Sequence, residues 1–243
     1  MLLFCALGVN AQSAKQWRDS LEILSKALDL NPSSIDLRLK KAAIEIELER
    51  YNYAIEEYSV VLKKDPRNLA ALFYRAFSNE KLNRYKFARS DYEDFLRIAP
   101  MNFEARLGLA LVNQRDKHFT EAFDQINMLV EQYPDSAVAY VARAGIEKER
   151  GAIDAAIFDW SEAIKRDNKN TDYYISRSDL FLIIGKRDDA LRDLEQAIKL
   201  GANRSALRNM LQRCKKDKYS HSITVLCFFF LSTLYFVQSY DLC

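Results

Sequence analysis

Glycine, proline and cysteine are scarce in this sequence. The chain of 243 residues contains only 6 glycines, 4 prolines and 4 cysteines. Glycine and proline punctuate turn-rich β folds, so their scarcity argues against such a fold and favours long helices. The cysteines lie near the two ends, at Cys5, Cys214, Cys227 and Cys243. The long middle section therefore has neither a disulfide framework nor the C-x-x-C spacing of a zinc site.

An excess of charge of one sign is also missing. The 36 basic and 34 acidic side chains are interspersed and leave a net charge of +2. Nucleic acid is not an expected partner, because no concentrated basic face is available to neutralise phosphates. The apolar share of 49% is too high for a disordered chain and is ordinary for a folded one.

Motifs of catalysis and metal binding are absent as well. The chain has two histidines and no H-E-x-x-H, G-x-S-x-G or P-loop pattern. His118 falls in an expected turn, where a solvated side chain is the simpler interpretation. Paired acids such as Asp188 and Asp189 are frequent on solvated helices. The sequence therefore predicts a protein that is not an enzyme, with no catalytic residue, no metal and no cofactor.

What the sequence does contain is a repeat. All four prolines, Pro32, Pro66, Pro100 and Pro134, are spaced 34 residues apart. A fixed period of this size is the signature of stacked structural repeats. Five repeats follow from it, in which we number the places 1 to 34: 35–68, 69–102, 103–136, 137–170 and 171–204. Place 20 is alanine in every repeat: Ala54, Ala88, Ala122, Ala156 and Ala190.

Each repeat has the pattern of two antiparallel helices. Apolar residues at places 20, 24, 27 and 28 form one stripe of an amphipathic helix. Alanines at places 8 and 20 mark the crossing of the two helices, because only a methyl group fits when helix axes approach to roughly 8 Å. Each proline ends a second helix, since the residue before a proline is pushed out of the α region. The predicted fold class is therefore all-α, built from antiparallel helix pairs.

This pattern resembles the tetratricopeptide repeat family. The stretch "YNYAIEEYSVVLKKDP" (51–66) carries the second-helix motif of the family, in Tyr51, Ala54, Tyr58, Leu62 and Pro66. The resemblance covers the five repeats at 35–204 and the second helix of a partial first repeat at 12–34. It implies a right-handed superhelical solenoid that acts as a protein–protein interaction scaffold. A polar capping helix is expected at 205–218, where such arrays close. At place 4, where the first helix of the family has a tryptophan, this chain departs from the pattern and has Arg38, Leu72, Arg106, Tyr140 and Tyr174.

Places 7 and 23 suggest an ion pair inside each repeat. Place 7 holds Lys41, Arg75, Leu109, Arg143 and Arg177. Place 23 holds Glu57, Asp91, Gln125, Asp159 and Asp193. The acid is replaced by a neutral residue in the same repeat that lacks the base, so we expect each pair to bridge the two helices of its own repeat. A structural bridge is the preferred interpretation and a charged ligand site the alternative; an exposed pair would contribute only about 0–1 kcal/mol.

A second face of the first helices is apolar. Places 2, 5, 9, 12 and 13 share one side of the helix, and the resemblance implies that this side lines a concave groove where peptides bind. The expected groove residues are Phe73, Phe77, Leu107, Leu111 and Val141. They favour a protein or peptide ligand with apolar side chains, unless neighbouring helices cover them. Some family members clamp a C-terminal carboxylate with Lys and Asn at places 5 and 9, and this chain has neither residue there.

The N-terminal end has two interpretations. The stretch "MLLFCALGVNAQS" begins with an apolar run from Leu2 to Val9, and Val9-Asn10-Ala11 then forms a small-residue cleavage pattern. Residues 1–11 therefore resemble a signal peptide cleaved after Ala11. No Lys or Arg precedes the apolar run. Phe4, Leu7 and Gly8 also match first-helix places of the repeat. A truncated first helix is therefore the competing interpretation.

The C-terminal end contains a candidate membrane anchor. Residues 219–240 include no formal charge over 22 residues, and a helix of this length would span about 33 Å, close to a bilayer core. Lys215, Lys216 and Lys218 precede it and obey the positive-inside rule only if the repeats stay in the cytoplasm. If a leader exports the repeats, these lysines lie outside the cell and break the rule, so the two interpretations conflict. The conflict is resolved if the tail does not span a membrane but docks elsewhere, for example in the apolar groove, or if the tail is a sequence artefact.

Two functions follow from these features. The first is a non-catalytic scaffold that binds a partner peptide or protein through its concave groove. The alternative is a membrane-anchored assembly or adaptor factor of the cell envelope. The expected location is membrane-associated, envelope or secreted, and it becomes soluble and cytoplasmic if both end segments are misread.

Overall fold

The computed structural model describes residues 2–215, with side chains from residue 15 onward. This part of the chain contains twelve α-helices and no strand. The five repeats hold ten of these helices, two in each repeat. The predicted all-α repeat solenoid is thereby confirmed.

The helix boundaries follow the period of the sequence. The first helices of the repeats are α2 (Ile35–Glu47), α4 (Leu69–Lys81), α6 (Phe103–Arg115), α8 (Ala137–Glu149) and α10 (Thr171–Ile183). The second helices are α3 (Tyr51–Lys64), α5 (Tyr85–Ile98), α7 (Phe119–Gln132), α9 (Ile153–Arg166) and α11 (Arg187–Lys199). The array is flanked by α1 (Leu2–Leu30) and α12 (Arg208–Lys215).

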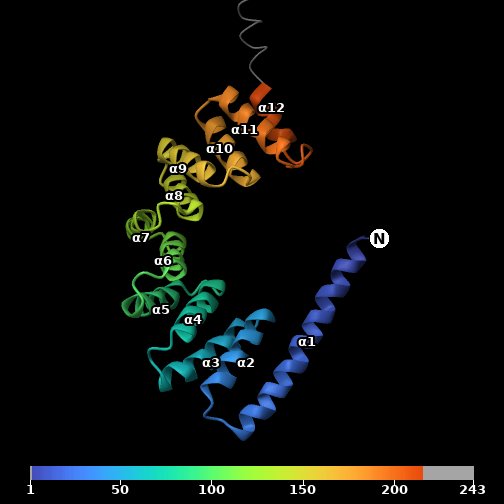
Figure 1. Ribbon diagram of the computed structural model, residues 1–243, viewed down its shortest axis with the longest axis vertical. Helices are drawn as coiled ribbons and strands as arrows, with labels where there is room; N and C mark the ends of the chain where they lie inside the picture. The colour runs from blue at the N-terminus through green and yellow to red at the C-terminus, as the bar shows by residue number, and fades with distance from the viewer. Residues whose placement is uncertain (1, 216–243) are drawn as a thin grey trace, which may run out of the picture. The chain divides into compact units, whose positions relative to one another are not determined.

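The helices belong to two compact units (Figure 1), Met1–Pro134 and the chain from Asp135 onward. In the first unit each helix from α1 to α6 packs against the next one, and α4 also contacts both α2 and α6. In the second unit α8 to α12 pack in the same consecutive order, and α10 also contacts α12. Within the first unit, therefore, the first helices of neighbouring repeats lie side by side.

The start of every first helix is capped by a polar side chain. Place 34 provides the cap in each repeat boundary: Ser34, Asn68, Asn102, Ser136 and Asn170. The side-chain oxygen of each one accepts a hydrogen bond from a backbone N–H in the first turn of the helix that follows. Proline stands two residues before four of these caps, and Asn168 before the fifth. Where the proline is present, the stop signal of one helix and the start signal of the next therefore lie within three residues.

A left-handed residue turns the chain between the two helices of each repeat. Place 15 has a positive φ between 56° and 77° throughout: Glu49, Asn83, Lys117, Gly151 and Gly185. The following residue donates its N–H to the carbonyl of place 11, as Arg50 does to Glu45 at 2.7 Å. This bond satisfies a carbonyl at the end of the first helix. Glycine occupies the strained position in only two repeats, so the turn is imposed by the packed helix pair and not by residue type alone.

Small residues bring the helices together. The alanines at place 20 are fully buried, as are those at place 8 in the first four repeats. Between repeats, Gly108 on α6 faces the buried ring of Tyr92 on α5. A Cβ atom added at Gly108 would lie 2.5 Å from the Cζ atom of Tyr92, so the ring keeps its place only opposite a glycine.

The end segments are described only in part. Helix α1 is continuous from Leu2 to Leu30 and passes through the predicted cleavage point after Ala11. No turn divides this helix at the predicted partial repeat, 12–34. Within residues 2–215, none of the helices combines the length and the apolar character that crossing a bilayer requires. The predicted anchor at 219–240 lies outside the described residues, and α12 lies inside the range expected for the capping helix.

Candidate functional site

The structure brings the members of each expected ion pair together. The Lys41 ammonium lies 2.7 Å from Glu57. The other three pairs are bidentate: Arg75–Asp91, Arg143–Asp159 and Arg177–Asp193. In each one the arginine Nε and Nη2 atoms donate to the two carboxylate oxygens at 2.6–2.9 Å. Each pair links the first helix of a repeat to the second helix of the same repeat.

These pairs are more than surface contacts. Asp91 is only 4% exposed and Asp159 only 1%. A buried carboxylate without a partner is strongly unfavourable, so each cation is needed wherever its acid is present. The value for an exposed pair, about 0–1 kcal/mol, therefore does not apply to removal of one partner.

The repeat without an ion pair has a substitute contact. Leu109 is buried, and the amide oxygen of Gln125 accepts a hydrogen bond from Arg106 at 2.9 Å. Arg106 stands at place 4, one helical turn before place 7. In the first repeat the arginine at place 4, Arg38, likewise donates to Glu57 at 2.6 Å. Place 4 thus supplies a second donor to place 23.

Place 4 also ties the first helix to the loop before it. Arg38 and Arg106 donate to the carbonyls of Pro32 and Pro100, and the Tyr174 hydroxyl donates to the carbonyl of Asn168. All three carbonyls lie six residues before the donor, at place 32. Arginine and tyrosine both have the length to reach that carbonyl, which explains how the place is filled without tryptophan.

The expected groove residues are all half-buried. Phe73 and Phe77 lie on α4, Leu107 and Leu111 on α6, and Val141 on α8. The first four belong to the first unit, in which α4 and α6 are in contact. Val141 belongs to the second unit and is described there alone.

Part of the groove already serves the internal packing. The ring of Phe73 makes edge-to-face contacts with Tyr92 and Phe95, with centroids 5.8 Å and 6.0 Å away. Phe77 has an edge contact with Tyr51 at 6.4 Å, and the ammonium of Lys81 lies 5.0 Å above its ring. Each phenylalanine therefore offers only its remaining surface to a ligand.

A cavity of about 260 Å³ opens beside Phe73. Leu69, Ala70 and Tyr74 on α4, together with Phe95 on α5, line it with largely apolar surface. Asn102 and Glu104, at the start of α6, complete the lining. The oxygen of Asn102 is already used to cap α6. Glu104 is exposed, which leaves a carboxylate beside an apolar hollow.

A buried polar position at place 11 was not predicted. Glu45, Asn79, Asn113 and Glu147 occupy it in the first four repeats, and all four are buried. Place 11 follows place 7 by four residues, so the two share one side of the first helix. This spacing is the only signal in the sequence that could have marked the position.

Glu147 has an unusual environment at this place. Burial, followed by the nearby carboxylate of Asp159, raises the pKa of Glu147 to about 7, while Arg143 and Arg150 act in the opposite direction. The glutamate is only 8% exposed. Burial also raises the pKa of Glu45, whose carboxylate pairs with Arg50 at 3.0 Å.

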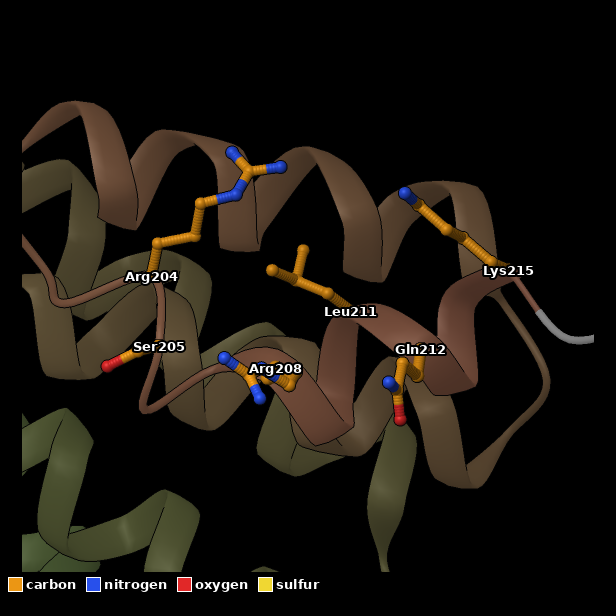
Figure 2. A pocket seen from close by; sticks show the side chains of 6 residues that line it. All are labelled: Arg204, Ser205, Arg208, Leu211, Gln212 and Lys215. Carbon is orange, nitrogen blue, oxygen red and sulfur yellow. The ribbon is translucent and has the colours of Figure 1, made fainter.

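A basic pocket of about 430 Å³ lies at the end of the described chain (Figure 2). It is lined by Arg204, Ser205, Arg208, Leu211, Gln212 and Lys215. Figure 2 shows the side chains of Arg204 and Lys215 pointing toward one another above Leu211. None of the three cations forms an ion pair with another residue of the described range 15–215.

Grouped metal ligands do not occur in the part of the chain that the structure describes. No cluster of three or more His, Cys, Asp or Glu side chains there has the proximity that a metal ion needs. His118, at the start of α7, is exposed beside Asp116 and Glu121.

Comparison with known proteins finds similarity to tetratricopeptide repeat proteins. A family model of the tetratricopeptide repeat matches residues 78–137. No curated protein sequence matches the chain. Among solved structures, a tetratricopeptide repeat protein from Parabacteroides merdae ATCC 43184 is 21% identical, with a TM-score of 0.61, over 84% of this chain and 80% of its own.

Two further structures have the same fold. YrrB, described as a TPR protein with an unusual peptide-binding site, is 18% identical, with a TM-score of 0.60, over 81% of this chain and 99% of its own. MamA from Desulfovibrio magneticus RS-1 is 14% identical, with a TM-score of 0.63, over 69% of this chain and 95% of its own. At these identities the likeness shows the arrangement of helices and nothing about ligands.

The ion pair of the second repeat can be tested against the neutral pair of the third. Arg75→Leu alone leaves the buried carboxylate of Asp91 without its cation, so we expect it to lower the free energy of unfolding by about 3 kcal/mol. The double variant Arg75→Leu/Asp91→Gln copies Leu109 and Gln125, although place 4 of this repeat is Leu72 and provides no donor like Arg106. We expect it to recover more than half of that loss, because a neutral amide costs less to bury than a carboxylate. Urea unfolding followed by circular dichroism measures both, and a double variant no more stable than Arg75→Leu would contradict the role of the pair.

The stability of the protein should depend on the ionisation of Glu147. Its pKa in the folded state is about 7, above the ordinary value of 4.5, so its contribution to stability is full below pH 4.5 and is lost as the pH rises through 7. A glutamine stays neutral. We therefore expect Glu147→Gln to raise the free energy of unfolding by about 1–3 kcal/mol at pH 8 and to change it little at pH 4.5.

The control for this prediction is Glu149→Gln, an exposed position on the same helix. Unfolding of both variants in urea between pH 4.5 and 8 separates a local effect of Glu147 from a general effect of removing a negative charge. If the free energy of unfolding changed with pH in the same way for the two variants, the prediction that ionisation of Glu147 destabilises the folded state would be contradicted.

Proposed function

Because the chain is a tetratricopeptide repeat protein, we propose that it acts as a non-catalytic scaffold that binds a partner peptide or protein. The binding surface is the side of the first helices that carries Phe73, Phe77, Leu107 and Leu111, with Val141 on the corresponding side of α8. Binding by this surface requires no bond-making step. Its contribution is the rigid presentation of apolar side chains by packed helices.

The cavity beside Phe73 is the observation that carries this proposal. An apolar hollow that the neighbouring helices leave open is suited to one aliphatic or aromatic side chain of a ligand. The exposed carboxylate of Glu104 beside it favours a ligand whose next residue is basic. The peptide-binding site ascribed to YrrB supports a peptide ligand for a protein of this fold.

Ala70 offers a test that leaves the core intact. It lines the cavity and is exposed, so Ala70→Glu places a carboxylate in the hollow without disturbing Phe73. Peptides selected from a random library on the wild-type chain should contain apolar side chains. We expect them to lose at least about tenfold in affinity for Ala70→Glu, measured by isothermal titration calorimetry.

The matched control is Ala152→Glu, the same change at an exposed position before α9. It should bind the selected peptides as the wild type does. Selection of uniformly acidic peptides, or equal binding by Ala70→Glu, would refute the groove assignment.

The basic pocket favours a second candidate function, that of a membrane-anchored assembly or adaptor factor of the cell envelope. Arg204, Arg208 and Lys215 line this pocket, and the sequence continues with Lys216, Lys218 and the uncharged residues 219–240. A basic residue near an anionic membrane surface contributes roughly 1 kcal/mol to binding. Cations directly before a membrane span would therefore hold the repeats close to the lipid headgroups on the cytoplasmic side.

Fractionation of cells tests this second candidate. The full chain should sediment with membranes and resist extraction at alkaline pH, whereas a chain without residues 219–243 should remain in the supernatant. The full chain with Arg204→Gln, Arg208→Gln and Lys215→Gln should still sediment, because the span provides most of the binding. A full chain found in the supernatant would exclude the anchored function.

A further inference from the structure

A second open pocket lies in the first unit, away from the groove. It has a volume of about 410 Å³ and is formed by α3, α4 and α5. Arg75 and Asn79 of α4 line it, each two residues after a groove phenylalanine. Two residues correspond to about 200° around a helix, so the pocket opens on the side of α4 that faces away from Phe73 and Phe77.

Asn79 brings an unused polar group to this pocket. The residue as a whole is only 5% exposed, and its side-chain amide makes no hydrogen bond with any residue of the range 15–215. The amide atoms are not enclosed, because Asn79 lines the open pocket and neither atom is a buried polar atom without a partner. Asn113, at the same place one repeat later, is similarly buried, but its Oδ1 atom accepts a hydrogen bond from the Nε atom of Arg89 at 2.7 Å. A buried amide is normally paired. The difference between the two asparagines therefore requires a cause.

The cause is the residue at place 21 of the preceding repeat. Arg89 holds that place before Asn113, whereas Ile55 holds it before Asn79 and also lines the pocket. An isoleucine side chain has no donor. The Asn79 amide therefore faces a pocket that has Ile55 on its wall. At the equivalent place of the next repeat, Arg89 donates a hydrogen bond to Asn113.

The last repeat has the same ion pair and serine contact, but its residue at place 11 has no amide. Phe181 stands there at the place of Asn79, and the guanidinium of Arg177 lies 5.7 Å above its ring. Arg177 still bonds Asp193 and the Ser161 hydroxyl, just as Arg75 bonds Asp91 and the Ser59 hydroxyl. The ion pair therefore does not need an asparagine at place 11, and an aromatic ring is compatible with the packing.

The remaining groups of the pocket determine which ligand it suits. Arg75 is occupied by Asp91 and Ser59, so its charge is neutralised. Arg84 is exposed, lines the pocket and has no ion-pair partner among residues 15–215, which leaves one positive charge. Phe87, next to it on the pocket wall, is 64% exposed. A free guanidinium and a free amide beside an exposed ring match a carboxylate with an apolar neighbour.

We propose that this pocket is a second ligand site, which binds an Asp or Glu side chain of a peptide through Arg84 and Asn79 while an apolar neighbour of that residue packs on Phe87. One unpaired cation balances the single charge of a carboxylate better than the nearly double charge of a phosphate. The site is independent of the groove, which we expect to take apolar side chains beside Glu104. Two faces of the same helix thus select ligands of different chemistry.

Two variants and one control test the site in the full chain. Asn79→Phe copies Phe181 and fills the pocket, and Arg84→Gln removes the free charge at an exposed position that folding does not require. Lys186→Gln is the control, because Lys186 holds the place of Arg84 in the repeat where Phe181 replaces the amide.

The probes are acetyl-Glu-Phe-amide, its neutral analogue acetyl-Gln-Phe-amide, and inorganic phosphate, titrated while the side-chain ¹⁵N–H₂ signals of Asn79 are followed by NMR. We expect a saturable shift with the acidic peptide only. Binding should be at least about tenfold weaker in Arg84→Gln and in Asn79→Phe, followed there on the backbone signal of Arg84, and unchanged in Lys186→Gln.

Several results would overturn the proposal. They are equal shifts with the glutamine peptide, tighter binding of phosphate than of the acidic peptide, no shift of Asn79 with any probe, or wild-type affinity in Arg84→Gln. The Arg84 variant keeps the test decisive even if Asn79→Phe folds poorly. Because the groove variant Ala70→Glu lies on the other side of α4, loss of groove binding leaves this result unaffected.

Discussion

The close approach of two helices at a pair of small residues is the constraint on which every repeat depends: alanine and alanine in the first four repeats, Ser178 and Ala190 in the fifth. Ala42 and Ala54 in the first repeat, and their equivalents later, are completely buried. A side chain much larger than alanine or serine at these places would push the helix axes apart. Places 7 and 23 are adjacent to this crossing in the two helices, so the same approach brings a cation and a carboxylate within hydrogen-bonding distance. The ion pair is thus a consequence of the alanine contact, and it in turn fixes the register of one helix against the other.

This arrangement gives each first helix two different sides. The side at places 5 and 9 carries the apolar groove residues, and the side at places 7 and 11 carries the buried polar ones. The second side is more restricted, because a polar group there needs a partner from the same repeat or from the one before it. Arg89 satisfies Asn113 in this way. At Asn79 no such partner is present, and the group is free for a ligand. At Glu147 burial and the carboxylate of Asp159 outweigh the nearby Arg143 and Arg150, so the pKa of the glutamate is raised.

The sequence predicts the architecture well because its repeated residues have the same side-chain role in every copy. Alanine at place 20 of all five repeats, proline at place 32 of the first three and the charge pattern at places 7 and 23 of four repeats each act through one property, so their recurrence is visible without coordinates. The five helix pairs follow from these places. The partners of the charged residues follow as well, since Arg75 and Asp91 vary together along the chain with their equivalents.

Other places have a constant backbone role but variable side chains, and these could not be predicted. Place 15 is left-handed throughout, yet it is filled by Glu49, Asn83 and Lys117 as well as by glycine. Place 34 is either serine or asparagine, and both side chains accept the capping hydrogen bond. In each case the packed helix pair imposes the conformation, so no single residue type marks the place in the sequence.

For the candidate site, the sequence predicts only which side of the first helices carries the apolar residues. Helical spacing places Phe73 and Phe77 on one side of α4, but it does not reveal that Tyr92 and Phe95 of the second helix take up part of the Phe73 ring. The open cavity beside Phe73 is what remains after that contact. Its position depends on the angle between α4 and α5, a property of the packed structure that no local pattern contains.

Differences between repeats are therefore the places where binding specificity is expected. A residue that recurs in all repeats is explained by the alanine crossing, the cap or the turn, and such a residue would be needed in any protein with these helices. Ile55 before Asn79, and Arg89 before Asn113, break the recurrence without breaking the fold, because Phe181 shows that place 11 also accepts a residue with no polar group. Since stability does not dictate the choice at such a place, the choice is free to follow the chemistry of a ligand.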